Sequence, residues 1–380
     1  MKLLSYQPFS LYETGGGSRI LRRLYEGHEA QVTSLFVKFF EGKPVRGSIE
    51  EKHVTIFPLV KPWMRWHVRS WAMNLQVNAF KAFTEKAICS AARKLHYDVI
   101  HVVNHGAFST TLCDDVARSG KVLWASFHDH FSINGSCFAE AERLWNQASR
   151  RLVISETMGE EYASLFGQKK YELITDGVLP HELSTPAAAN NDSTIFYFAG
   201  LLHHDYLPLF STLADALNIL AKQGKNVRLV LRGTQRVDFL ENRSFTVEYR
   251  PVTLNQAELK KELDAATVLY LPIKLTNPDF YLYSLSTKMV GYLAAPGAIL
   301  YHGPKDSAAG ELLQQAEAAV CSETLDAQEL VDSIKELLER GGKAYSENAK
   351  ELVREKFDLL QIRHTFWQLT PTRHDENIPV

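Results

Sequence analysis

Short apolar segments alternate with helical segments along almost the whole chain, and this alternation is the feature that most constrains the fold. Examples of the apolar segments are residues 2–6, 97–103 and 121–127. Hydrophobic runs of this length predict buried strands, and the stretches between them are long enough for crossover helices. Strands joined by helices form right-handed β-α-β units, which build parallel sheets. The sequence therefore predicts an α/β protein whose ligands bind at the carboxyl ends of its strands.

The alternation is interrupted once, at residues 184–194, where no large apolar side chain occurs. This composition is typical of a linker between domains. Strands then resume at 195–200 and 227–233, and each of these two segments ends in a glycine. A chain of 380 residues is long enough for two ordinary domains with full cores. We expect two domains, residues 1–183 and 195–356, and a terminal helical segment, about residues 357–380, that packs back on the first domain.

Charge and cysteine content exclude several classes of protein. A formal net charge of -2 argues against a protein that binds nucleic acid through bulk positive charge. The four cysteines form no C-x-x-C pair, so the sequence predicts neither a zinc site nor a disulfide framework. The chain opens directly on a predicted strand, and no segment approaches the roughly 18 apolar residues of a spanning helix. We expect a cytoplasmic protein, either free or peripheral at the inner face of the plasma membrane.

Three consecutive glycines, Gly15, Gly16 and Gly17, separate the first predicted strand from an amphipathic helical segment. Glycine has no side chain and loses the most backbone entropy on folding, so such a row indicates a sharp turn or a close approach to a ligand. Amides at a helix N-terminus carry a partial positive charge, which suits a phosphate or a sugar hydroxyl. A tight strand-to-helix turn and a ligand-binding loop are both consistent with the triplet.

Several short motifs follow one another in order along nearly the whole chain. In the first half they are GHE at 27–29, DVIH at 98–101, SFHD at 126–129, VISETM at 153–158 and ITDGV at 174–178. In the second half they are FAG at 198–200, VLRG at 230–233 and SLSTKMVGYLA at 284–294. Together they resemble the nucleotide-sugar glycosyltransferases of the GT-B fold, most closely the retaining glycosyltransferase family 4.

The resemblance implies two Rossmann-like, doubly wound parallel-sheet domains that face an interdomain cleft. It also implies that the first domain binds the acceptor and the second a nucleotide-diphosphate-sugar donor, with no metal ion and no cofactor. Gly200 and Gly233, which end two strands of the second domain, then belong to the donor site. The triplet of Gly15, Gly16 and Gly17 is expected to face the donor from the first domain, where its amides would approach the diphosphate or the transferred sugar.

Lys288 is the residue that we expect to stabilise the leaving diphosphate, because the growing negative charge needs cations or helix amides. Ser284, Ser286 and Thr287 precede it where a helix would begin, so hydroxyls, amides and the ammonium group could converge on one phosphate. The alternative is an ordinary N-cap beside a solvated lysine. Arg232, at the end of a predicted strand, is expected to be a second catalytic cation, or else a surface arginine at a strand terminus.

His128 ends a predicted strand at the sheet edge where such folds bind ligands. Its imidazole is expected to bind a sugar hydroxyl or, with Asp129, to assist deprotonation of the acceptor. His105 follows the preceding strand and is expected to bind the acceptor together with Asp129, although a structural or surface role is the alternative for such histidines. We do not predict a metal site at His128, Asp129 and His130, because adjacent residues of an extended segment point to opposite faces.

Two positions depart from the family pattern. Family members commonly carry a glutamate three residues after the lysine, where it holds the nucleotide ribose, and here that position is Gly291. The arginine and lysine that usually follow the glycine of the FAG motif are replaced by LLHHDY at 201–206. These departures leave the identity of the nucleotide open, and they keep a non-catalytic, degenerate sugar- or nucleotide-binding protein as an alternative.

Residues 61–71, KPWMRWHVRSW, interleave three tryptophans with Lys61, Arg65 and Arg69. Aromatic rings at headgroup level and cations facing anionic lipid are typical of a segment at a membrane surface. A helix that packs its rings into the core and turns its basic residues to water is the alternative. A lipid-linked acceptor would explain why residues 61–71 would lie at a membrane surface.

The function predicted from the resemblance is that of a retaining glycosyltransferase. It would move a hexose-like sugar from a nucleotide diphosphate to a saccharide or lipid-linked acceptor, in the synthesis of surface polysaccharide or cell-envelope glycan. No carboxylate nucleophile is evident in the sequence, so we expect the leaving phosphate itself to assist the acceptor on the same face. A nucleotide-sugar epimerase and the non-catalytic binding protein are the alternatives.

Overall fold

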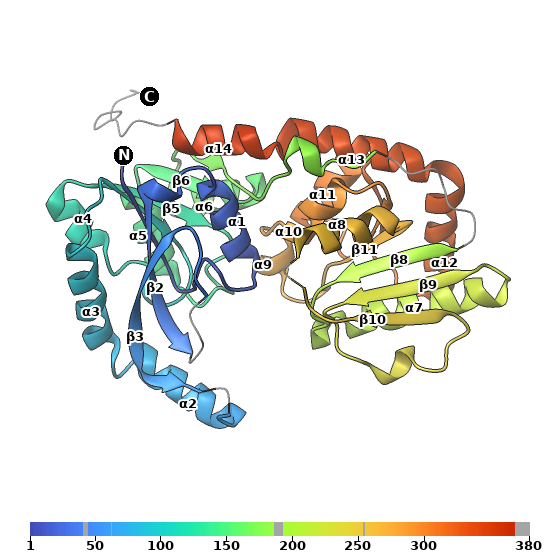
Figure 1. The fold of residues 1–380 in the computed structure, drawn as a ribbon, viewed down its shortest axis with the longest axis horizontal. Coiled ribbons are helices and arrows are strands. Elements are labelled where there is room, and N and C mark those ends of the chain that lie inside the picture. The colour runs from blue at the N-terminus through green and yellow to red at the C-terminus, as the bar shows by residue number, and fades with distance from the viewer. Residues whose placement is uncertain (41–44, 62, 186–192, 254, 369–380) are drawn as a thin grey trace. The chain divides into compact units, whose positions relative to one another are not determined.

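The computed structural model describes residues 1–380 except 41–44, 62, 186–192, 254 and 369–380. The chain forms two compact units, one of Met1–Asp176 with Gln361–Val380 and the other of Gly177–Leu360 (Figure 1). The predicted linker at 184–194 lies in the second unit, and its residues 186–192 lie outside the described residues. The same holds for residues 369–380 of the predicted terminal segment.

A parallel sheet forms the centre of the first unit. Within the described residues it has seven strands in the order β3-β2-β1-β4-β5-β6-β7. The strands are β1 Leu3–Gln7, β2 Val32–Phe40, β3 Glu50–Val60, β4 Val99–Val103, β5 Val122–Phe127, β6 Arg150–Val153 and β7 Glu172–Leu173. The strand order reverses at β1, which pairs with both β2 and β4. The loops that follow β1 and β4 therefore flank the point where ligands bind in sheets of this topology.

Helices connect the strands of the first unit, and a last helix follows the second unit in the chain. They are α1 Gly16–Tyr25, α2 Trp66–Val77, α3 Lys81–Arg93, α4 Cys113–Ser119, α5 Phe138–Gln147, α6 Glu156–Phe166 and α14 Leu359–Trp367. The last of these contacts α1, since the indole nitrogen of Trp367 donates to the Leu24 carbonyl at 2.8 Å. Phe366 is fully buried and lies against the rings of Tyr25 and Trp124.

Residues 66–93 form two helices, α2 and α3, with a break between them. The break follows Asn78, whose side-chain amide donates to the Asn74 carbonyl at 3.1 Å. A side-chain hydrogen bond of this kind competes with the helical backbone pattern and favours termination. Helix α2 begins at Trp66 and includes two of the three tryptophans of residues 61–71.

The second unit repeats the architecture with a six-stranded parallel sheet in its described residues, in the order β10-β9-β8-β11-β12-β13. The strands are β8 Thr194–Ala199, β9 Val227–Arg232, β10 Thr246–Arg250, β11 Val268–Pro272, β12 Ala298–His302 and β13 Ala319–Ser322. The strand order reverses at β8, which pairs with β9 and with β11. The carboxyl end of β8 is thus the expected ligand position of this sheet.

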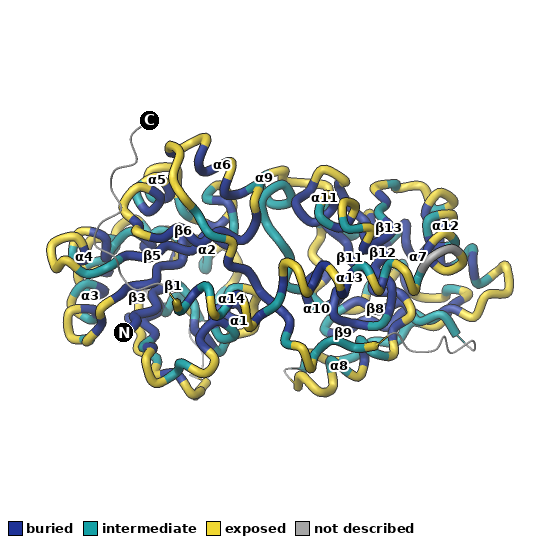
Figure 2. The backbone as a smooth tube through the Cα atoms, turned by 90° about the horizontal axis from the view of Figure 1, so that it is seen from above, coloured by how far each residue is buried: buried dark blue, intermediate teal, exposed yellow. Residues whose placement is uncertain are grey.

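Helices cover both faces of the second sheet. They are α7 Leu207–Lys222, α8 Gln256–Ala265, α9 Pro278–Tyr281, α10 Thr287–Leu293, α11 Ala308–Gln315, α12 Ala327–Glu336 and α13 Gly342–Lys356. One core cluster joins the sheet to α10 and α13, and a separate cluster joins it to α7 and α12. Figure 2 shows the central strands as buried backbone surrounded by exposed turns. Two cores on opposite faces of one sheet are the mark of a doubly wound domain.

Candidate functional site

Lys288 lies at the strand reversal of the second unit, beside the carboxyl end of β8. Its ammonium nitrogen is 4.0 Å from the centroid of the Phe198 ring. The same nitrogen would be 3.0 Å from a Cβ atom at Gly200, so a larger residue there would displace it. The structure therefore brings together two residues that the sequence assigned to the donor site.

The charge of Lys288 is partly desolvated and has no carboxylate partner. Burial lowers the pKa of Lys288 from its usual 10.5 to about 8, so the ammonium form still predominates at neutral pH. In the part of the chain that the structure describes, Lys288 makes no salt bridge, and its charge faces only the Phe198 ring. A desolvated cation with this environment is suited to an anionic ligand.

The residues around Lys288 form a helix start and two strand ends. Ser286 is the N-cap of α10, and its hydroxyl accepts from the Lys288 amide at 3.2 Å. Ser284 and Thr287 are half-buried beside it. Gly200 and Gly233 have φ angles of 143° and 71°, which strongly favour glycine. The Gly200 amide donates to the Arg232 carbonyl at 2.9 Å, so the ends of β8 and β9 are joined.

Arg232 is not an available cation. Its guanidinium is buried and pairs with the carboxylates of Glu258, at 2.7 Å, and Glu262. It also donates to the Pro251 carbonyl at 2.6 Å. The hydrogen bonds to Glu262 raise the pKa of Arg232 further. This network neutralises the charge, so the arrangement favours a structural role in place of the catalytic role expected from the sequence.

Gly291, at the position of the family glutamate, lies on α10 three residues after Lys288. No atom of the described residues lies within 4 Å of the place a Cβ would take there. The structure thus leaves room for a side chain to begin at this position.

His128 follows the last residue of β5 in the first unit and is only 7% exposed. Among the described residues, neither of its ring nitrogens has a hydrogen-bond partner. Burial lowers its pKa to about 4, and the nearby His105 contributes in the same direction. His128 is therefore neutral at pH 7. A buried polar ring without partners is costly, and it is the kind of feature that marks a ligand site.

His105 and Asp129 lie close to His128. Burial lowers the pKa of His105, and the Asp129 charge partly offsets this effect. The His105 ring meets the edge of the Phe9 ring, with 6.1 Å between centroids. The described residues include no group of three or more His, Cys, Asp or Glu side chains placed to hold a metal ion. The structure thus brings His105, His128 and Asp129 into one neighbourhood.

The glycine triplet has a packing reason at one of its positions. A Cβ at Gly17 would lie 2.8 Å from the Phe9 ring, so this position keeps the loop after β1 close to α1. Gly15 is the N-cap of α1, and no atom lies within 4 Å of a Cβ placed there. Packing against Phe9 accounts for Gly17, and the role of the three glycines in donor binding stays a prediction.

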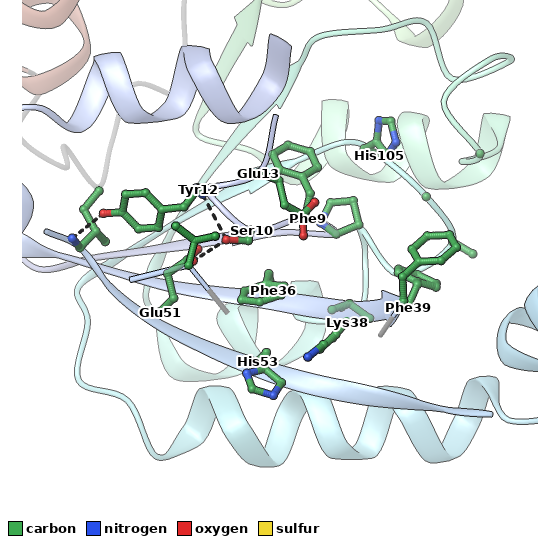
Figure 3. Close-up of a pocket in the computed structure, with 18 of the residues that line it drawn as sticks. Phe9, Ser10, Tyr12, Glu13, Phe36, Lys38, Phe39, Glu51, His53 and His105 are labelled. Atoms are coloured by element: carbon green, nitrogen blue, oxygen red, sulfur yellow. Dashed lines mark hydrogen bonds between the residues drawn. The ribbon is translucent and has the colours of Figure 1, made fainter. Parts of the chain in front are cut away.

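A cavity of about 870 Å³ lies in the first unit, beside the loops that follow β1 and β4. Figure 3 shows Phe9 and Glu13, from the loop after β1, facing Phe36 and Lys38 of β2. His105 is the one predicted site residue in its wall. The other wall residues were not predicted from the sequence. For Phe36 the reason is that a strand aromatic beside a cavity has the same sequence pattern as a core aromatic.

The tryptophans of residues 61–71 are exposed. Trp63, Trp66 and Trp71 have exposed fractions of 74%, 82% and 61%, so they do not pack into the core as the alternative required. Among the helices that the structure describes, none has the length and apolar composition needed to cross a membrane. The three rings therefore form part of a surface.

Comparisons with known proteins identify the fold. No protein-family model matches the sequence, and the curated proteins include no similar sequence. Solved structures do match. The structure of HepE from Anabaena in complex with UDP is 16% identical, with a TM-score of 0.69, over 97% of this chain and 99% of that chain. Sucrose-phosphate synthase from Thermosynechococcus elongatus is 16% identical, with a TM-score of 0.68, over 97% of this chain and 98% of that chain.

A third similar structure is α,α-trehalose 6-phosphate synthase from Burkholderia multivorans. It is 12% identical to this chain, with a TM-score of 0.65, over 96% of this chain and 95% of that chain. At these identities the likeness establishes the fold and not the activity. With both parallel sheets and nearly the full length matched, the chain has the GT-B fold of two Rossmann-like domains.

Proposed function

We propose that the protein is a glycosyltransferase that uses a nucleotide-diphosphate-sugar donor. The observation that carries the proposal is the desolvated Lys288 ammonium beside Gly200 at the strand reversal of the second unit. A cation with no carboxylate partner at this position suits a diphosphate. The similar structure of HepE contains UDP, which agrees with a nucleotide ligand for this fold.

The proposed reaction retains the configuration of the sugar. The bond between the anomeric carbon and the diphosphate oxygen breaks, and a bond to the acceptor oxygen forms on the same face. The acceptor proton passes to the leaving phosphate oxygen, which thus acts as the base. Lys288, with backbone amides at the start of α10, stabilises the charge that grows on the diphosphate. This positive charge comes from the protein, so we propose that transfer does not require a metal ion.

His128 has a binding role in this proposal. A histidine whose pKa is about 4 is a weak base, so it is poorly matched to acceptor deprotonation at neutral pH. Its neutral ring can still donate from one nitrogen and accept at the other, which matches a sugar hydroxyl. His105 and Asp129 would position the acceptor beside it.

We propose a saccharide or lipid-linked acceptor in the synthesis of surface polysaccharide or cell-envelope glycan. The exposed tryptophans and cations of residues 61–71 support a peripheral contact with the inner face of the plasma membrane. The proposed location is accordingly the cytoplasm and its membrane surface.

The test is hydrolysis and transfer with a panel of UDP-, GDP- and ADP-sugars, with and without EDTA. We expect one nucleotide to bind in calorimetry and its sugar to be released slowly to water without added metal. NMR of the released sugar should show the configuration of the donor. Binding without release would favour the non-catalytic alternative, which the unfilled space at Gly291 supports. Absence of binding by all three nucleotides would contradict the proposal.

A further inference from the structure

We propose that the cavity of the first unit holds the hydrocarbon chain of a membrane-lipid acceptor, which reaches it along α2 from an anionic membrane surface. This inference rests on the proposed transferase function and specifies its acceptor. Two observations carry it, the apolar wall of the cavity and the surface of helix α2, which contributes Met73 and Val77 to that wall.

The wall of the cavity is mostly apolar. Phe9 comes from the loop after β1, Phe36 and Phe39 from β2, and Met73 and Val77 from α2. A cavity of about 870 Å³ is in the size range of sites that enclose an organic ligand. Because apolar surface gains free energy when it leaves water, such a wall binds a hydrocarbon group in preference to a free sugar.

The acidic groups of the cavity are held by the protein itself. The Glu51 carboxylate accepts from the Leu11 amide at 2.8 Å, the Ser10 hydroxyl at 2.6 Å and the Ser34 hydroxyl at 3.0 Å. These bonds tie the loop after β1 to β3, so Glu51 needs no cationic ligand. Burial raises the pKa of Glu13, which also lines the wall.

Helix α2 connects the cavity to the outer surface. Met73 and Val77, which line the cavity, share one helical face with Trp66, because residues seven and eleven positions apart fall at nearly the same angle. Trp66 is the most exposed of the large apolar residues, at 82%. Trp66, Met73 and Val77 thus form a stripe along one helix from the cavity wall to a ring in solvent, with Ser70 between Trp66 and Met73.

The sequence around this stripe is basic, and of its cations Lys81 pairs with Glu140 at 3.5 Å. No aspartate or glutamate occurs from residue 52 to residue 84, whereas this stretch contains Lys61, Arg65, Arg69 and Lys81. Phe57 and Phe83 are exposed in the same stretch, at 65% and 70%. Exposed rings in a basic stretch complement an anionic lipid surface, where rings enter the headgroup region and cations meet phosphates. This charge pattern is why a lipid is favoured over a soluble aromatic acceptor.

The test is binding of cis-parinaric acid, a fluorescent fatty acid, to the full chain without vesicles. We expect saturable binding by the wild type and a loss of at least tenfold in affinity in Met73→Trp, which narrows the cavity. His67→Trp adds the same ring to an exposed position of α2 outside the cavity wall and should bind as the wild type does. Val77→Trp provides a second narrowing variant should Met73→Trp fold poorly.

UDP binding and thermal unfolding of each variant separate this inference from the proposed function. All three variants should keep the UDP affinity of the wild type, since α2 and Lys288 belong to different units. Equal parinarate binding by Met73→Trp, Val77→Trp and His67→Trp would overturn the inference, as would binding of a soluble aromatic glycoside with no parinarate binding. A dimer that dissociates in Met73→Trp would overturn it in favour of a second copy on this face.

Discussion

The ammonium nitrogen of Lys288 lies 4.0 Å from the centre of the Phe198 ring, and no carboxylate in the described part of the chain pairs with it. The aromatic face offsets part of the cost of desolvating the cation. A carboxylate would offset more, but it would also neutralise the charge that a diphosphate needs. The contact therefore keeps a cation in place while leaving its charge available.

Lys288→Ala should weaken UDP binding by about tenfold to a hundredfold, because a hydrogen bond to a charged group contributes about 1.5–3 kcal/mol. Calorimetry with the purified variant measures this loss. Lys305→Ala removes an exposed lysine of the same unit and should leave the affinity unchanged. Unchanged affinity and turnover in Lys288→Ala would remove this residue from the donor site.

Donor affinity should also depend on pH through Lys288. Its pKa of about 8 means that the free protein loses this charge as the pH rises above that value. Affinity for UDP should therefore be nearly constant from pH 6.5 to about pH 7.5 and fall tenfold for each unit well above pH 8. Lys288→Arg keeps its charge throughout and should show no such decline. A wild-type profile that stays flat to pH 10 would exclude this titration.

The alternation of strands and helices predicted the architecture well. Every predicted strand of the second unit corresponds to an observed one, and glycine follows β8 and β9 as expected. The break between α2 and α3 was not predictable from periodicity, since apolar residues recur on both sides of it. It lies at Asn78, whose side-chain amide donates to the Asn74 carbonyl.

The sites were predictable only where a motif marks them. Lys288 and Gly200 belong to quoted motifs, and the structure places them side by side. The neutral network of Arg232 could not be predicted, because Glu258 and Glu262 approach it from a later helix. The cavity was missed because Phe9 and Phe36 have the same sequence pattern as core residues, and a void is a property of packing and not of periodicity.

Gly291→Glu should raise the affinity for UDP about tenfold, because the space around this position is open and the family glutamate holds the ribose there. Gly291→Ala is the matched control. Both substitutions should stabilise α10, by about 0.5–1 kcal/mol for alanine, since glycine is unfavourable inside a helix. Equal UDP affinity in the two variants would show that the ribose lies elsewhere.

His128 should make the protein less stable in acid. The unfolded chain takes up a proton near pH 6.5, whereas the folded chain resists it until about pH 4. The unfolding free energy should therefore fall as the pH decreases through this window, by about 1.4 kcal/mol per pH unit for this histidine. His101 and His302, with pKa values lowered to about 3 and about 4, add to the same trend.

His128→Phe should reduce the pH dependence of the unfolding free energy by the amount that one proton contributes. It should not lower stability at pH 7, because the described residues give the His128 nitrogens no hydrogen-bond partner to lose. Urea unfolding at several pH values measures both effects. In His101→Phe, by contrast, the Ser126 hydroxyl loses the ring nitrogen that it contacts at 2.6 Å, so stability should fall at every pH. An unchanged slope in His128→Phe would contradict the assigned pKa.

The last prediction concerns the surface of α2. Trp66→Glu combined with Arg65→Glu should abolish flotation with vesicles of phosphatidylcholine and phosphatidylglycerol, because it removes an exposed ring and reverses a charge in a stretch without acidic residues. Each lost basic residue near an anionic membrane contributes about 1 kcal/mol, and the acidic replacements add repulsion.

The matched control makes the same change of charge on the second unit, with Leu325→Glu and Lys222→Glu at exposed positions. It should float as the wild type does, and both variants should bind UDP equally. Wild-type protein should bind neutral phosphatidylcholine vesicles weakly, and salt should weaken its binding to anionic ones, because mobile ions screen exposed charges. Flotation of the Trp66→Glu, Arg65→Glu variant at the wild-type level would show that the tryptophans and cations of this surface serve another partner.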